Sequence, residues 1–288
     1  MRATFLLIAT NLAVITVLGA ITSMLNLPNQ AAMIVFAAVI GFGGAFISLA
    51  MSKTIAKMST RAQVITEPRS SQEMWLVNTV ARQARTLGIK TPEVAIFPSP
   101  EPNAFATGMN KNAALVAVSA GLLNTMTQDE VEAVLGHEMA HVANGDMVTL
   151  TLVQGVVNTF VIYVARVLGT IIDQALFRRD DGGYHPGPGY WIINIVLQMV
   201  LGVLAQMIVA WFSRYREFRA DAGGAHLAGK RKMVAALQRL QAITQAHKAT
   251  PQLPREVEAF GISGGIGSLF ASHPPLERRI AALQASQG

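Results

Sequence analysis

The sequence predicts a mainly α-helical membrane protein with four transmembrane helices and a cytoplasmic α+β domain formed from two chain segments. Four apolar runs approach the roughly 20 residues that a helix needs to cross a bilayer. Hydrophobic residues make up 51% of the 288 residues and charged residues only 14%, whereas an ordinary soluble domain carries about 25% charged residues. If all four runs span, 20 of the 23 Lys and Arg residues share one side of the membrane.

The apolar runs divide the chain into four predicted parts. Two of these parts are transmembrane hairpins, residues 1–52 (runs at about 4–25 and 31–51) and 147–212 (runs at about 147–167 and 191–212). The other two are polar segments, which together form the α+β domain, at residues 53–146 and 213–288. A cleaved signal peptide is the alternative for the first run, because Arg2 precedes it. That run is too long for a signal peptide and a second run follows it directly, which favours a membrane anchor.

The third run is the least regular of the four. It contains Gln154, Asn158 and Thr159, and Arg166 lies at its far end. The alternatives are a membrane span whose arginine reaches the interface and a helix buried in protein. Its length favours a span.

The distribution of basic residues predicts the orientation. Cytoplasmic loops carry the excess of Lys and Arg, so both polar segments are expected in the cytoplasm. The net charge of +6 is then explained by topology and by attraction to anionic lipid headgroups. The sequence contains no basic patch with interleaved aromatic residues, so a nucleic-acid partner is not expected. The chain has no cysteine, so a metal site would have to use His, Asp or Glu.

Local signals predict the elements of the polar segments. Ser70 and Glu73, like Thr127 and Glu130, have the spacing of a helix-capping box. Alternation and flanking prolines predict strands. The expected elements are helices from Ser70 to Gly88, from Thr127 to about Val142, at 214–227 and at 231–247, strands at 93–97 and 113–118, a glycine-rich loop at 261–267 and a short helix after Pro275.

The second capped helix carries an H-E-x-x-H motif, His137-Glu138-Met139-Ala140-His141. Residues four apart share one face of a helix, so both imidazoles can bind one Zn²⁺. The adjacent Glu138 can then serve as general base toward water, as in metallopeptidases.

A catalytic zinc needs a third protein ligand. The candidates are His185, His226, His247, His273 and several carboxylates, and Glu217 is the best placed because its helix starts where the fourth run ends. Asp221 lies four residues further on, where it could orient a ligand imidazole. The alternative for this pair is a solvated charged helix face.

These motifs together resemble the HtpX family of bacterial membrane metallopeptidases, relatives of the CAAX prenyl proteases. The resemblance covers nearly the whole chain and rests on four ordered landmarks, residues 103–108 (NAFATG), 137–141 (HEMAH), 216–221 (REFRAD) and 272–280 (SHPPLERRI). It implies a zincin-type (gluzincin-like) catalytic domain, one Zn²⁺ per chain and Glu217 as third ligand. It also implies a place in the bacterial cytoplasmic membrane and a role in stress response and quality control of damaged membrane proteins.

The resemblance also implies roles for residues in two of these four landmarks. Asn103, together with Ala104 and Phe105, looks like part of the strand that holds extended substrate beside the metal. His273 looks like an imidazole that stabilises the oxyanion of the tetrahedral intermediate. From the residues alone, Asn103 reads as a turn residue and His273 as a turn or helix-entry residue.

Three other functions compete with a general membrane peptidase. A CAAX-type processing peptidase is disfavoured by the short chain with four spans. A scaffold with a structural zinc is disfavoured by Glu138, since a structural site needs no base. A transporter would place ionisable residues in mid-membrane, and only Arg166 approaches that position. The expected partners are the bilayer and membrane-protein substrates, and the sequence predicts nothing about oligomerisation.

Overall fold

The computed structural model describes residues 30–176, 188–249 and 273–286. They fall into two compact units, the first within 1–48 and 149–209 and the second within 49–148 and 210–288. The predicted run at 4–25 and the glycine-rich loop at 261–267 lie outside the described residues.

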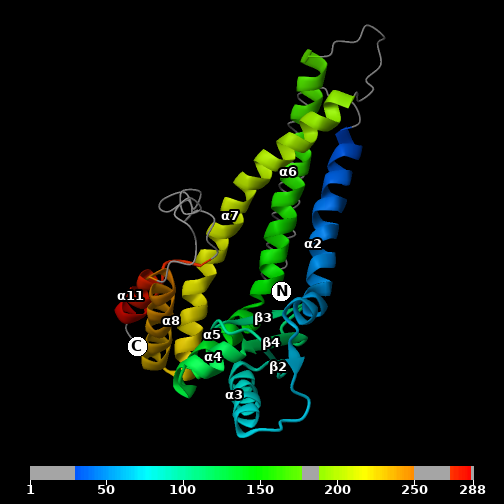
Figure 1. Ribbon diagram of the computed structural model, residues 1–288. Helices are drawn as coiled ribbons and strands as arrows, with labels where there is room; N and C mark the ends of the chain where they lie inside the picture. The colour runs from blue at the N-terminus through cyan, green and yellow to red at the C-terminus, as the bar shows by residue number, and fades with distance from the viewer. Residues whose placement is uncertain (1–29, 177–187, 250–272, 287–288) are drawn as a thin grey trace. The chain divides into compact units, whose positions relative to one another are not determined.

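The first unit contains parts of three long helices, α2 (Gln30–Thr60), α6 (Asp146–Leu176) and α7 (Pro188–Ala228), which Figure 1 shows as the longest ribbons of the chain. Each has the length and apolar composition of a membrane span, over Met33–Thr60, Asp146–Leu176 and Gly189–Ala228. Together with the small sheet described below, they make this a mainly helical membrane protein.

Small residues bring α2 and α6 together. A Cβ added to Gly41 would lie 2.7 Å from the backbone nitrogen of Thr159, and one added to Gly155 would lie 2.7 Å from the ring of Phe42. Such close approach is typical of helix pairs in membranes. The guanidinium of Arg166 lies 4.0 Å from the centre of the Phe36 ring, so a cation–π contact accommodates the charge at the end of the third predicted run.

Helix α7 is longer than the sequence pattern indicates. The predicted fourth run and the predicted helix at 214–227 are one continuous helix of 41 residues. No glycine or proline interrupts residues 203–222, so the helix continues without a break where its composition changes from apolar to charged.

The second unit contains a four-stranded sheet of order β1-β2-β4-β3. Its strands are β1 (Gln63–Val64), β2 (Glu93–Phe97), β3 (Ala104–Gly108) and β4 (Ala114–Ser119). Strands β2 and β4 are parallel, and β3 pairs antiparallel with β4, Ala104 opposite Val118. β4 is buried along its whole length, whereas β3 forms an edge of the sheet. The sequence pattern did not predict β1 or β3.

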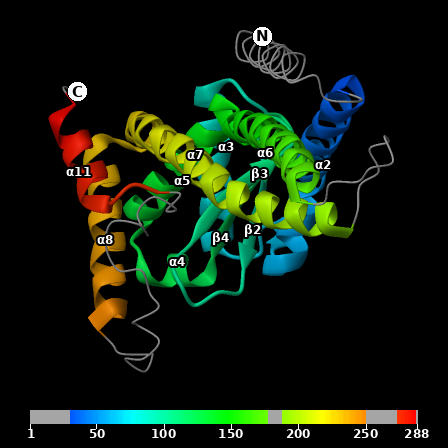
Figure 2. The same ribbon diagram turned by 90° about the horizontal axis from the view of Figure 1, so that it is seen from above.

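Helices α3 (Ser71–Leu87), α4 (Ala120–Thr125), α5 (Gln128–Asn144), α8 (Lys230–Ala249) and α11 (Leu276–Ala285) complete this unit. α8 and α11 lie side by side in both views (Figure 2). The main core joins buried residues of both chain segments, such as Leu76, Val116 and Leu135 from the first and Leu237 and Ile280 from the second. The segment 273–286 is therefore part of the same folding unit as the H-E-x-x-H helix.

Candidate active site

Helix α5 presents the H-E-x-x-H motif from a helix with well-defined ends. The Thr127 side chain accepts a hydrogen bond from the Glu130 backbone, and the Glu130 carboxylate accepts one from the Thr127 backbone, so the predicted capping box is present. The helix ends at Gly145, which has a φ of 67°. This left-handed conformation suits glycine and lets the chain turn directly into α6.

His137, His141 and Glu217 come together as a group that could hold a metal ion, with one ligand atom from each within 4.8 Å of the others. The Nε2 atoms of the two imidazoles are 3.2 Å apart. Glu217 of α7 faces both, its carboxylate oxygens 3.5 Å from His137 Nε2 and 3.3 Å from His141 Nε2. Two imidazole nitrogens and one carboxylate oxygen form a donor set typical of catalytic zinc.

The other nitrogen of each imidazole has its own carboxylate. Nδ1 of His137 lies 2.9 Å from Asp221, and Nδ1 of His141 lies 2.7 Å from Asp146. Both carboxylates are almost fully buried, with 1% of their surface exposed. An N–H group held at Nδ1 leaves the Nε2 lone pair for a metal, so the two aspartates orient the rings toward the shared position.

Arginines hold these carboxylates in turn. Arg279 of α11 donates to both oxygens of Asp221, from Nε at 2.8 Å and Nη2 at 2.5 Å, and its Nη1 lies 3.3 Å from Glu217. Arg219 pairs with the Asp146 carboxylate, and Arg216 donates to the Asp146 carbonyl at 2.9 Å. The buried negative charges are thus compensated by cations from two elements.

The carboxylates also set the protonation of the imidazoles. Burial opposes the charged form of His137, but hydrogen bonds with Asp221 and Glu217 outweigh it and raise the pKa of this ring. Burial acts in the same direction on His141, and hydrogen bonds with Asp146 and Glu217 raise its pKa to about 9. A setting that favours imidazolium also favours a divalent cation, which must displace the Nε2 proton of each ring to bind.

Close contact between α5 and α7 brings His137 and His141 of α5 within reach of Glu217 of α7. A Cβ added to Gly224 would lie 2.9 Å from the backbone nitrogen of His137, and one added to Gly223 would lie 2.6 Å from the Ala140 Cβ. Two successive glycines therefore allow the backbone of α7 to approach the turn of α5 that carries His137 and Ala140. Glu217 lies two turns earlier on the same helix.

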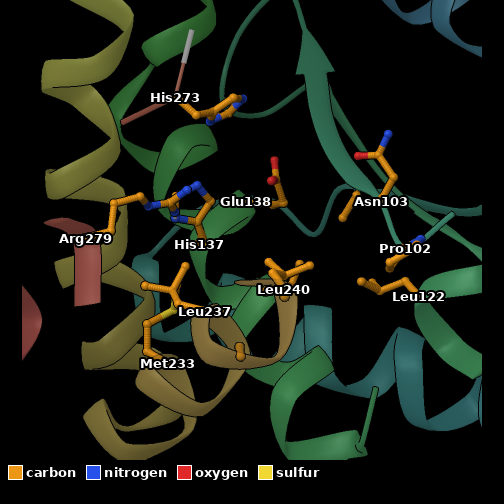
Figure 3. Close-up of a pocket in the computed structure, with 13 residues that line it drawn as sticks. Pro102, Asn103, Leu122, His137, Glu138, Met233, Leu237, Leu240, His273 and Arg279 are labelled. Carbon is orange, nitrogen blue, oxygen red and sulfur yellow. The ribbon is translucent and has the colours of Figure 1, made fainter. Parts of the chain in front are cut away.

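A cavity of about 160 Å³ lies beside these residues. Figure 3 shows the Glu138 carboxylate between His137 and Asn103, with His273 above it and Leu237 and Leu240 below. One part of the lining is polar, and Pro102 and Ala104 line the cavity near the start of β3. The other apolar residues come from α4, α5 and α8, namely Leu122, Val134, Met233, Ala236, Leu237 and Leu240. The cavity offers a hydrophobic recess directly beside the Glu138 carboxylate.

The remaining predicted residues lie in different places. His273 is 64% exposed at its side chain, lines the cavity, and donates from Nδ1 to Glu217 at 2.7 Å. Asn103 and Ala104 also line it, and Asn103 is tied to Ser119 by backbone and hydroxyl hydrogen bonds of 2.8 and 2.9 Å. The Phe105 ring instead packs against Phe97, 5.5 Å between centroids.

The sequence predicts no role for Asp146, Arg279 or Gly224. Asp146 lies five residues beyond His141 and across a helix end, so no helical spacing relates the two. Arg279 is 58 residues from its partner Asp221. Arg279 belongs to the landmark at residues 272–280, but the resemblance gave a role there only to His273.

The H-E-x-x-H helix, the carboxylate from a second helix and the adjacent cavity together define a metallopeptidase site. The profile described as Peptidase family M48 matches residues 70–287, and the chain belongs to this family. It is accordingly a metallopeptidase, and its apolar helices make it a membrane protein.

Similar proteins extend this assignment over the whole length. The chain is 57% identical to Protease HtpX of Thioalkalivibrio sulfidiphilus, with 100% of both chains covered. It is 58% identical to Protease HtpX of Xanthomonas axonopodis pv. citri (99% of this chain, 97% of that one) and of Nitrosococcus oceani (97% of each). The resemblance of the sequence to this family is therefore confirmed.

A solved structure shares the fold. S. mikatae Ste24p matches with a TM-score of 0.62 and 17% sequence identity over 98% of this chain. The chain spans 64% of the length of that protein. At this identity the likeness concerns the fold alone.

Proposed function

We propose that this chain is a zinc-dependent endopeptidase of the bacterial cytoplasmic membrane that binds one Zn²⁺ through His137, His141 and Glu217. The observation that carries this proposal is the convergence of two Nε2 atoms on one buried carboxylate while each Nδ1 is held by an aspartate. A structural site closed by a fourth protein ligand is disfavoured, since Glu138 and the cavity lie next to the ligands and a catalytic site keeps an open position.

When bound there, zinc would supply a Lewis acid that acidifies water and polarises a carbonyl group. Glu138 accepts the proton of the attacking water and delivers it to the leaving amine. His273 lines the same cavity and donates a hydrogen bond to the oxyanion. In this role its imidazole leaves Glu217 and turns toward the substrate.

The edge strand β3 is the proposed place for the substrate backbone. β4 occupies one side of β3, and an extended peptide can add to the other side through main-chain hydrogen bonds. Asn103 and Ala104, at the start of this strand, line the cavity that contains Glu138. A peptide paired with this end of β3 would therefore pass beside the general base.

We further propose four membrane spans, with the second unit in the cytoplasm and membrane proteins as substrates. Support comes from the predicted run at 4–25, the three apolar helices and the basic residues, of which 20 of 23 fall on one side. The relatives are named proteases. An enzyme in this location would act in quality control, as part of a stress response, by cleaving misfolded or damaged membrane proteins.

The test of this proposal is the metal content of Glu217→Ala. We expect this variant to lose most of its zinc and its peptidase activity, because a carboxylate ligand is removed from a buried site. Glu67→Ala is the control, since Glu67 is an exposed carboxylate of the same unit. Full zinc occupancy in Glu217→Ala, measured by elemental analysis of purified protein, would exclude Glu217 as the third ligand.

A further inference from the structure

The first unit contains a polar cavity that the peptidase reaction does not use. It has a volume of about 420 Å³ and lies among α2, α6 and α7. Its polar side chains are Ser48 of α2, Thr151, Gln154 and Asn158 of α6 and Gln206 of α7. Gly44 and Ala45 of α2 add small residues to its lining. We call this feature the polar groove.

The polar groove is open to its surroundings, and its lining is uncharged. Gly44, Ser48 and Gln206 are exposed. None of the described residues that line it is charged. Amide and hydroxyl groups both donate and accept hydrogen bonds. The groove therefore suits a neutral polar ligand rather than an ion or a phosphate headgroup, which basic residues bind.

Hydrogen bonds between the helices do not explain the three amide side chains of the groove, Gln154, Asn158 and Gln206. Gln154 donates to Asn158 at 2.8 Å, one turn away on the same helix. Among the described residues, neither side chain is hydrogen-bonded to α2 or α7, and Gln206 makes no side-chain hydrogen bond. Polar side chains within membrane helices are costly and usually face a partner or an aqueous pathway. Leucine at these positions would give a more stable helix surface in lipid.

We propose that the polar groove binds a transmembrane segment of a membrane-protein substrate, at a point where that segment carries an unpaired polar side chain or interrupted helical backbone. The proposal rests on the proposed function, since it assumes membrane-protein substrates. A folded membrane protein satisfies such groups internally, whereas a misfolded or unassembled one exposes them to lipid. The groove thereby selects substrates by the defect that marks them.

Two reporter proteins test this proposal in proteoliposomes that contain the zinc-loaded enzyme. Both carry the same unfolded cytoplasmic tail, one on an all-apolar Leu/Ala span and one on the same span with a central Asn pair. We expect wild-type enzyme to cleave the Asn reporter about three- to tenfold faster, as one or two hydrogen bonds within a bilayer provide. The double variant Asn158→Leu/Gln206→Leu should reduce this ratio to about one.

The matched control is Gln198→Leu, which removes a polar side chain of α7 that pairs with Asn194 and does not line the groove. It should keep the wild-type ratio. Equal cleavage of the two reporters by wild-type enzyme, or a ratio that persists in the double variant, would overturn the proposal. If wild-type enzyme cleaves neither reporter, the proposed peptidase function is contradicted instead. Crosslinking then tests whether the groove binds the reporter.

Crosslinking uses the Glu138→Gln chain so that captured substrate stays intact. A photoreactive residue at Gln206 should capture the Asn reporter, whereas one at Met199, which is 68% exposed on the same helix, should capture little. Equal capture from both positions would contradict the proposal. Capture of residues 4–25 of the enzyme itself, in place of the reporter, would also contradict the proposal.

Discussion

The two histidines of the motif depend on different aspartates, and only one of these was predictable. Asp221 lies four residues after Glu217, and this helical spacing placed it near the ligands. Asp146 follows His141 across Gly145, yet it holds His141 Nδ1 at 2.7 Å. His137, Glu138 and His141 could be found because metal binding fixes their spacing along one helix. Asp146 belongs to another element, and no spacing rule relates it to the motif.

We expect Asp146→Asn and Asp221→Ala each to lower zinc affinity by about 10–100-fold, as the loss of a carboxylate behind a ligand imidazole commonly does. Competition with a chromogenic chelator measures this affinity directly. Asp129→Asn is the control, because Asp129 pairs with Lys232 away from the imidazoles. Wild-type zinc affinity in Asp146→Asn would show that His141 needs no such partner.

Helix α7 has the greatest influence on the site among the elements, because it carries Glu217, Asp221 and the glycines that contact α5. Its apolar part and its charged part were predicted separately, since composition changes sharply near Ser213.

The strands differ in how well they were predicted. β2 and β4 are buried and rich in Val, Leu and Ile, whereas the edge strand β3 has the weak pattern Ala-Phe-Ala-Thr-Gly.

Gly224→Ala tests the contact between the two ligand-bearing helices. The added methyl group would meet the His137 backbone, and overpacking of this kind costs about 1–3 kcal/mol. We expect a lower midpoint of thermal unfolding in detergent and a lower zinc content. Gly202→Ala is the matched control on α7, since nothing lies within 4 Å of its Cβ position. An equal effect of both substitutions would mean that helix propensity, and not this contact, determines the outcome.

At the scale of the whole molecule, two distant chain segments form the unit that contains the site. Composition and charge distribution predict the order of apolar and polar segments, because bilayer thickness and the positive-inside tendency act on long stretches. They do not specify which residues of the two polar segments meet. The contacts of α5 with α8 and of Arg279 with Asp221 arise from packing, which no local pattern encodes.

Single-cysteine labelling tests the proposed topology, and it suits this chain because the chain has no native cysteine. A probe at Gly182, between the third and fourth runs, should react with a membrane-impermeant reagent from outside the cytoplasm. Probes at Asn110 and Gln252 should react only from inside. If the Gly182 probe is reachable only from inside, the last two runs do not cross the membrane.

The most direct test of the peptidase site is to remove the general base and leave the metal ligands in place. Wild-type enzyme should contain one zinc per chain, lose activity when a chelator removes it and recover activity when zinc is restored. Glu138→Gln should keep the zinc and lose turnover by about 10²–10⁴-fold, the usual contribution of a positioned base. Near-normal turnover by zinc-loaded Glu138→Gln would contradict the mechanism.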